Sequence, residues 1–193
     1  MSVDPVASQR APILADPHTS VDAYLELFAA ATDGPQYEVV DGQPVVSPSP
    51  DGAHQVCVRM PLLSLHAACP PGHEVMVAPW DWVLWELPRL AIRQPDLMVV
   101  RSSLATAPRL TEPPLLAVEI LSAGSFERDA VTKRAEYAKA GLDDYWVVDP
   151  RSAEVFVHLR HGDDLRLASV VDASTPATVE SPFAVSVHLA QRD

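Results

Sequence analysis

Two carboxylates stand inside apolar runs that are typical of buried strands, and carboxylates in such places can bind metal ions or activate water. Glu119 interrupts the run LLAVEILS at residues 115–122, and Asp96 lies at the start of the run QPDLMVV. An ionised carboxylate in a dry core is costly unless it is paired, protonated or bound to a cation. Glu119 therefore belongs either to a cleft or to a structural ion pair with an arginine.

The carboxylates of Asp96 and Glu119 can converge if their two strands pair. Pro95 cannot donate to a sheet ladder, which places Asp96 near a strand start or an edge. Two neighbouring carboxylates repel each other unless a cation lies between them. Oxygen-rich sites suit Mg²⁺ or Mn²⁺. Many proteins carry two acidic residues on strands, so the pattern alone does not separate a metal site from an ion pair.

Lys133 is a third candidate, in a helix predicted after the Glu119 strand. Asp129, Lys133 and Tyr137 are spaced four residues apart and share a helix face. This helix can place Lys133 over the two carboxylates. The alternative is a solvated Lys133 paired with Asp129, with Tyr137 packed in the core.

The first half of the chain predicts helices around one hairpin. A helix begins at Thr19 or Ser20 and ends at Gly34, and YEVVDGQPVVS predicts a hairpin that turns at Asp41 and Gly42. Apolar spacing predicts a second helix over residues 53–68. Pro61 lies inside it and is expected to kink or shorten it.

Strands dominate the second half, interrupted by one helix, SFERDAVTKRAEYAKAGL, with Ser125 as N-cap and Gly141 at its end. The predicted strands are HEVMVAP, DWVLWE, PDLMVV, LLAVEIL, DYWVVD, a hairpin of AEVFVHLR and LRLASVV, and an edge strand in FAVSVHL. This order predicts an α/β (α+β) fold with one central mixed sheet flanked by helices. We expect residues 1–17 to form a flexible arm and residues 18–193 to form a single domain.

Composition narrows the function classes. Fourteen basic and 26 acidic residues give a net charge of −12, which argues against broad electrostatic attachment to nucleic acid or to an anionic membrane. We expect no signal peptide and no transmembrane span. Two cysteines make no disulfide framework, so we expect a reducing, cytoplasmic location. Walker, GxGxxG and GxSxG motifs are absent.

Three quoted stretches resemble one known family. The segments YEVVDGQPVVSPSPDGAHQ, QPDLMVV and LAVEILSAGSFERDAVTKRAEYAKAGLDDYWVVDP are similar to the Uma2-like (DUF820) endonucleases of the PD-(D/E)XK superfamily. The resemblance covers about residues 20–160, and DAVTKRAEYAKAGLDDYWVVDP is its most specific part. It implies a restriction-endonuclease-like core, a mixed sheet flanked by helices.

The resemblance also implies a site. Asp96 matches the aspartate of the PD element, and Glu119 matches the acidic residue of the (D/E)XK element. Leu121 stands where the common pattern has its lysine, and Lys133 matches the family's lysine on the next helix. Glu38 matches an acidic residue near the first strand of the superfamily.

These matches imply an Mg²⁺-dependent (or Mn²⁺-dependent) endonuclease that hydrolyses phosphodiester bonds in DNA. Asp96, Glu119 and the backbone carbonyl of Ile120 would hold the metal, and Lys133 would assist the attacking water. Glu38 would support the site, and His54 would contact the substrate.

The net charge of −12 leaves a competing interpretation open. It is a catalytically silent interaction or accessory protein on the same scaffold. Analogy with the superfamily also suggests a homodimer.

Overall fold

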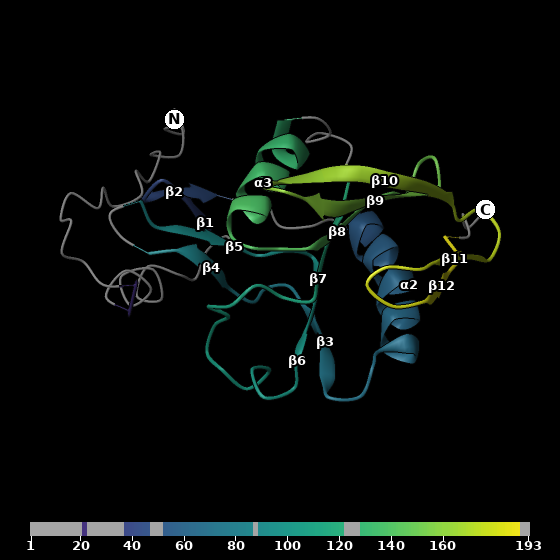
Figure 1. Ribbon diagram of the computed structural model, residues 1–193, viewed down its shortest axis with the longest axis horizontal. Coiled ribbons are helices and arrows are strands. Elements are labelled where there is room, and N and C mark those ends of the chain that lie inside the picture. Colours follow the sequence, from purple (N-terminus) through teal and green to yellow (C-terminus); the bar gives the residue numbers. More distant parts are fainter. Residues whose placement is uncertain (1–20, 23–36, 47–51, 87–88, 122–127, 190–193) are drawn as a thin grey trace, which may run out of the picture.

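The computed structural model describes residues 21–22, 37–46, 52–86, 89–121 and 128–189, and Figure 1 shows how their elements are arranged. Residues 21 and 22 are helical. The rest of the first predicted helix, the predicted arm at residues 1–17 and the predicted N-cap Ser125 lie outside the described residues. Within the described part of the chain, no helix is both long and apolar enough to cross a bilayer.

The largest sheet has six strands in the order β10-β9-β8-β7-β6-β3. They are β3 (His73–Val77), β6 (Leu97–Arg101), β7 (Leu116–Ile120), β8 (Asp144–Asp149), β9 (Glu154–His161) and β10 (Asp164–Asp172). Neighbours pair antiparallel except β7 and β8, which are parallel and joined through helix α3 (Arg128–Lys139). The predicted mixed sheet and the α+β fold class are confirmed.

Alternation along β7 divides its side chains between two cores, because successive strand residues face opposite sides of a sheet. Val118 and Ile120 belong to the core that includes helix α2 (Gly52–Ala68). Ala117 belongs to the other core, together with Tyr137 of α3. Glu119 shares the α3 side, as the sequence predicts.

A four-stranded sheet with the order β2-β1-β5-β4 carries the N-terminal hairpin. Its strands are β1 (Tyr37–Val40), β2 (Gln43–Val46), β4 (Trp82–Trp85) and β5 (Ala91–Arg93). The turn residues Asp41 and Gly42 have φ values of 48° and 74°, the left-handed conformation that tight hairpin turns require. The sequence predicts this hairpin but not β5, because a three-residue strand is too short to show a period.

The predicted C-terminal strand is β12 (Val185–Val187), and its position corrects the prediction of one sheet. It pairs antiparallel with β11 (Ala177–Val179) to form a separate two-stranded sheet that packs beside α2 (Figure 1). The strand β11 is again only three residues long and was not predicted.

Helix α2 runs without interruption from Gly52 to Ala68, so the expected shortening at Pro61 is wrong. Proline removes one backbone hydrogen bond within a helix. Here Pro61 is buried, and α2 packs on β3, β7 and β12. These tertiary contacts offset the lost hydrogen bond.

Candidate functional site

Pairing of β6 with β7 brings Asp96 and Glu119 to one place. The register pairs Leu97 with Val118, so the next position in each direction places Asp96 opposite Glu119. Asp96 Oδ2 accepts a hydrogen bond of 2.7 Å from the backbone N–H of Ile120. The condition considered from the sequence, that these two strands pair, is thus met.

Helix α3 covers Glu119 with two side chains one turn apart. Lys133 Nζ lies 3.0 Å and 3.1 Å from the two carboxylate oxygens of Glu119. The Tyr137 hydroxyl donates a hydrogen bond of 2.7 Å to Oε1. The Glu119 side chain is 13% exposed. Its ion-pair partner is therefore a lysine rather than the arginine considered from sequence, and Tyr137 both packs in the core and orients the carboxylate.

Glu38 approaches the same ammonium group from the four-stranded sheet. Its Oε1 lies 3.2 Å from Lys133 Nζ and accepts a hydrogen bond of 3.2 Å from the backbone N–H of Gln94. Its Oε2 accepts a hydrogen bond of 2.9 Å from Arg93. Lys133 is thus held between carboxylates from two sheets, which sequence spacing could not show.

Arg93 is a site residue that the sequence analysis missed. It is 5% exposed, and besides Glu38 it contacts Glu136 of α3 at 2.7 Å. It therefore ties β1 to α3 and fixes Glu38 against Lys133. The signal was an arginine within the apolar run LAIR directly before QPD, which is an unusual place for a charge.

His54 lies at the start of α2, where its Nε2 is 3.5 Å from Asp96 Oδ2. The side chains of His54 and Asp96 are 13% and 18% exposed, respectively. His54 therefore lies next to Asp96 in the cluster. The structure brings all five predicted side chains into one cluster: Glu38, His54, Asp96, Glu119 and Lys133.

The cluster carries more negative than positive charge. Four carboxylates (Glu38, Asp96, Glu119 and Glu136) face two cations (Arg93 and Lys133), so 2 − 4 leaves −2 when all are ionised and His54 is neutral. Burial, with repulsion from Asp96 and Glu38, raises the pKa of Glu119 to about 7 against the attraction of Lys133. Burial alone lowers the pKa of Lys133, but Glu119 and Glu38 outweigh burial and raise it, so the ammonium stays charged.

This donor set fits a hard divalent cation at Asp96 and Glu119. Such ions prefer carboxylate and carbonyl oxygens. Glu119 Oε1 accepts two hydrogen bonds, from Lys133 and Tyr137, but Oε2 accepts one and keeps a second lone pair. The Ile120 N–H points to Asp96, and the carbonyl of a strand residue points the same way as its N–H. The described residues contain no group of three or more His, Cys, Asp or Glu side chains placed to hold a metal ion. The backbone carbonyl of Ile120 would be the third donor from the protein.

The Glu119 pKa predicts how stability changes with pH in a buffer that contains a chelator. The pKa is 4.5 in the unfolded chain and about 7 in the folded one, so the folded protein binds this proton more tightly. The associated stability is present below the unfolded pKa and is lost as the pH rises through the folded one. This shift corresponds to about 3 kcal/mol.

We expect the wild type to lose about that much stability relative to Glu119→Gln between about pH 5 and about pH 8. Urea denaturation of both proteins at the two pH values measures it. If the free energies of unfolding of the wild type and of Glu119→Gln differ by the same amount at both pH values, the expectation is contradicted.

Comparisons with known proteins identify the family and the fold. Residues 21–191 match the model of the Uma2 family, which is described as "Putative restriction endonuclease". Among solved structures, the crystal structure of "a putative nuclease belonging to DUF820" from Anabaena variabilis matches with a TM-score of 0.63 and 19% sequence identity, covering 81% of this chain and 89% of that one. This likeness shows a shared fold. No curated protein matches the chain.

Proposed function

Because the chain belongs to the Uma2 family of restriction-endonuclease-like proteins, we propose that it is a metal-dependent endonuclease that hydrolyses phosphodiester bonds in DNA. The observation that carries the proposal is the contact of Lys133 with Glu119 beside Asp96. A charged ammonium group and two carboxylates converge there, at the edge of a buried cluster. Phosphodiester hydrolysis needs this combination, because negative charge develops on the phosphate while water attacks.

Each residue has a role that its contacts support. Asp96, Glu119 and the Ile120 carbonyl would hold Mg²⁺ or Mn²⁺, and the bound ion would supply a water of lowered pKa and polarise the phosphate. Lys133 keeps its proton and donates from Nζ to the attacking water or to the phosphate oxygens. The Tyr137 hydroxyl holds Glu119 in place, and the Glu38 carboxylate holds Lys133 in place.

Binding and cleavage together test the assignment. We expect the wild type to bind Mn²⁺ in calorimetric titration and to nick supercoiled plasmid when Mg²⁺ or Mn²⁺ is added. Asp96→Asn keeps the size of the side chain and its acceptor for the Ile120 N–H but removes the charge. It should weaken Mn²⁺ binding by about 10-fold or more and lower nicking in parallel. The control is Asp163→Asn, in the exposed β9–β10 turn. It loses the same charge and should match the wild type in both Mn²⁺ binding and nicking.

Absence of Mn²⁺ binding at millimolar metal would overturn the metal-dependent function. That result would favour the second candidate, a catalytically silent interaction protein. The observation behind the second candidate is that Lys133 already neutralises Glu119.

A further inference from the structure

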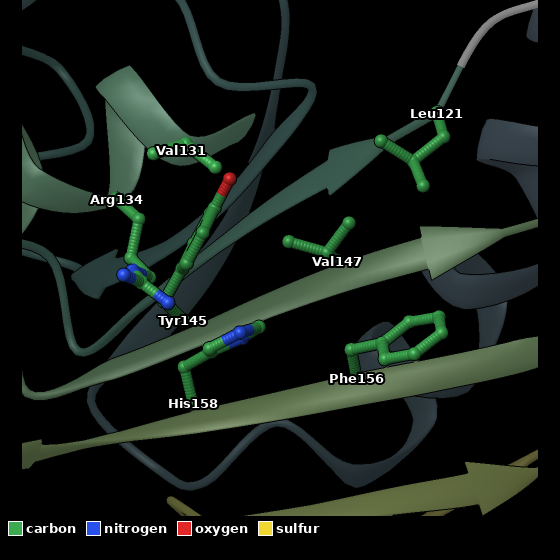
Figure 2. A pocket seen from close by; sticks show the side chains of 7 residues that line it. All are labelled: Leu121, Val131, Arg134, Tyr145, Val147, Phe156 and His158. Carbon is green, nitrogen blue, oxygen red and sulfur yellow. The ribbon is translucent and has the colours of Figure 1, made fainter. Parts of the chain in front are cut away.

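A pocket of about 190 Å³ lies between α3 and the six-stranded sheet (Figure 2). The β7–β8 register places Val147 across from Glu119, and Leu121 follows Glu119 on the same face. Both Val147 and Leu121 line the pocket. Tyr145, another lining residue, packs edge-on against Tyr137 with ring centroids 5.4 Å apart. Tyr137 in turn donates a hydrogen bond to Glu119, so the two packed tyrosines connect the pocket to the site.

The pocket has a polar end and an apolar end, which Figure 2 shows side by side. Arg134, Tyr145 and His158 form the polar end, and Leu121, Val147 and Phe156 form the apolar end. Val131 of α3 also lines the pocket and is 58% exposed, so the pocket is open to solvent there. Tyr145 is 0% exposed and belongs to its floor.

Three polar atoms at the polar end are buried without a hydrogen-bond partner: the Tyr145 hydroxyl, Arg134 Nε and His158 Nδ1. Within the described part of the chain, Arg134 also forms no ion pair. Such unsatisfied groups are costly and rare in native proteins. An arginine nitrogen can only donate, and a tyrosine hydroxyl can donate too. The missing partner is therefore a group that offers acceptor atoms.

A nucleobase matches both ends of the pocket. Its ring faces are apolar and its edges carry acceptor atoms, whereas a phosphate would leave the apolar end without contacts. The volume equals roughly six water molecules at about 30 Å³ each, which is the scale of one ring rather than of a whole nucleotide. Nucleic-acid enzymes commonly take up single extruded bases between apolar and aromatic side chains.

We propose that this pocket receives one unpaired base of the DNA strand, next to the phosphodiester bond that is cut, and this rests on the function proposed above. The ring lies against Phe156 and Val147. The Tyr145 hydroxyl and Arg134 donate to acceptors on its edge. Because Val147 is adjacent to Glu119, the strand that inserts the base also passes the carboxylates.

Equilibrium binding of DNA strands to the protein tests this proposal. A chelator in the buffer prevents metal-dependent cleavage during the measurement. The probe is a fluorescent single DNA strand about 12 nucleotides long, compared with the same strand made entirely of abasic nucleotides. In the wild type, the strand with bases should bind roughly 10-fold or more tightly than the abasic one. Arg134→Ala and Tyr145→Phe should each reduce that ratio severalfold. Arg166→Ala removes the same charge on exposed β10 and should keep the ratio.

Equal binding of the two strands by the wild type would overturn the proposal, and so would an unchanged ratio in both pocket variants. A base dependence seen with an RNA strand but not with DNA would overturn the assignment to DNA. These outcomes are independent of plasmid nicking, so failure of the pocket and failure of the nuclease are distinguishable.

Stability gives a second, separate check. Tyr145→Phe removes a buried hydroxyl that has no partner and leaves the ring in place. We expect its unfolding midpoint in urea to equal or exceed that of the wild type, while its base dependence falls. A lower midpoint would show that the hydroxyl has a structural partner and would overturn the argument.

Discussion

Glu119→Gln is expected to lower metal-dependent cleavage of plasmid DNA by about 10³-fold. Glutamine keeps the shape of the side chain and can still accept the hydrogen bond from Tyr137. It removes the negative charge that would bind the cation and that holds Lys133 at 3.0 Å. The initial rate of nicking at saturating Mg²⁺ measures the loss. Calorimetric titration with Mn²⁺ should show a parallel loss of affinity.

The matched control is Glu74→Gln on strand β3, which β6 separates from the Glu119 strand β7. Glu74 is exposed, so this variant changes the net charge equally without touching the cluster. We expect it to cut at the wild-type rate. Equal nicking by wild type and Glu119→Gln would remove Glu119 from the mechanism, because no other change in the variant could restore a lost metal ligand.

Arg93→Met is expected to lower the free energy of unfolding by about 3–5 kcal/mol. Arg93 is buried between Glu38 and Glu136, at 2.9 Å and 2.7 Å. Burial raises the pKa of Glu38, but attraction to Lys133 and to Arg93 outweighs burial and holds this pKa below its usual value. Methionine fills similar space but leaves both carboxylates without this partner. Urea denaturation at neutral pH measures the change.

Arg101→Met is the matched control, because Arg101 pairs with Glu112 on the surface, with side chains 63% and 48% exposed. Exposed pairs contribute about 0–1 kcal/mol, so this variant should remain close to the wild type. The double variant Arg93→Met/Glu38→Gln also removes the charge of one of the two carboxylates that lose Arg93 as a partner. It should therefore regain part of the lost free energy of unfolding. Similar losses for Arg93→Met and Arg101→Met would contradict a buried network.

The local pattern of the sequence was sufficient to predict the strand of Glu119 and the hairpin of Glu38, but not the short strand β5 that carries Arg93. The run LLAVEILS predicted a buried strand, and this is confirmed. The hairpin that carries Glu38 followed from Asp41 and Gly42, whose left-handed backbone is a property of the turn itself. These features depend on neighbours in the chain, so a single sequence contains them.

The partners of the charges depended on the tertiary structure. Lys133 contacts Glu119 and Glu38, which are 14 and 95 residues away in the chain and belong to different sheets. Arg93 and the pocket between α3 and the six-stranded sheet became visible only with the strand order and the position of α3. Electrostatic and packing energies depend on distance in space, and residue spacing along the chain does not encode that distance between separate elements.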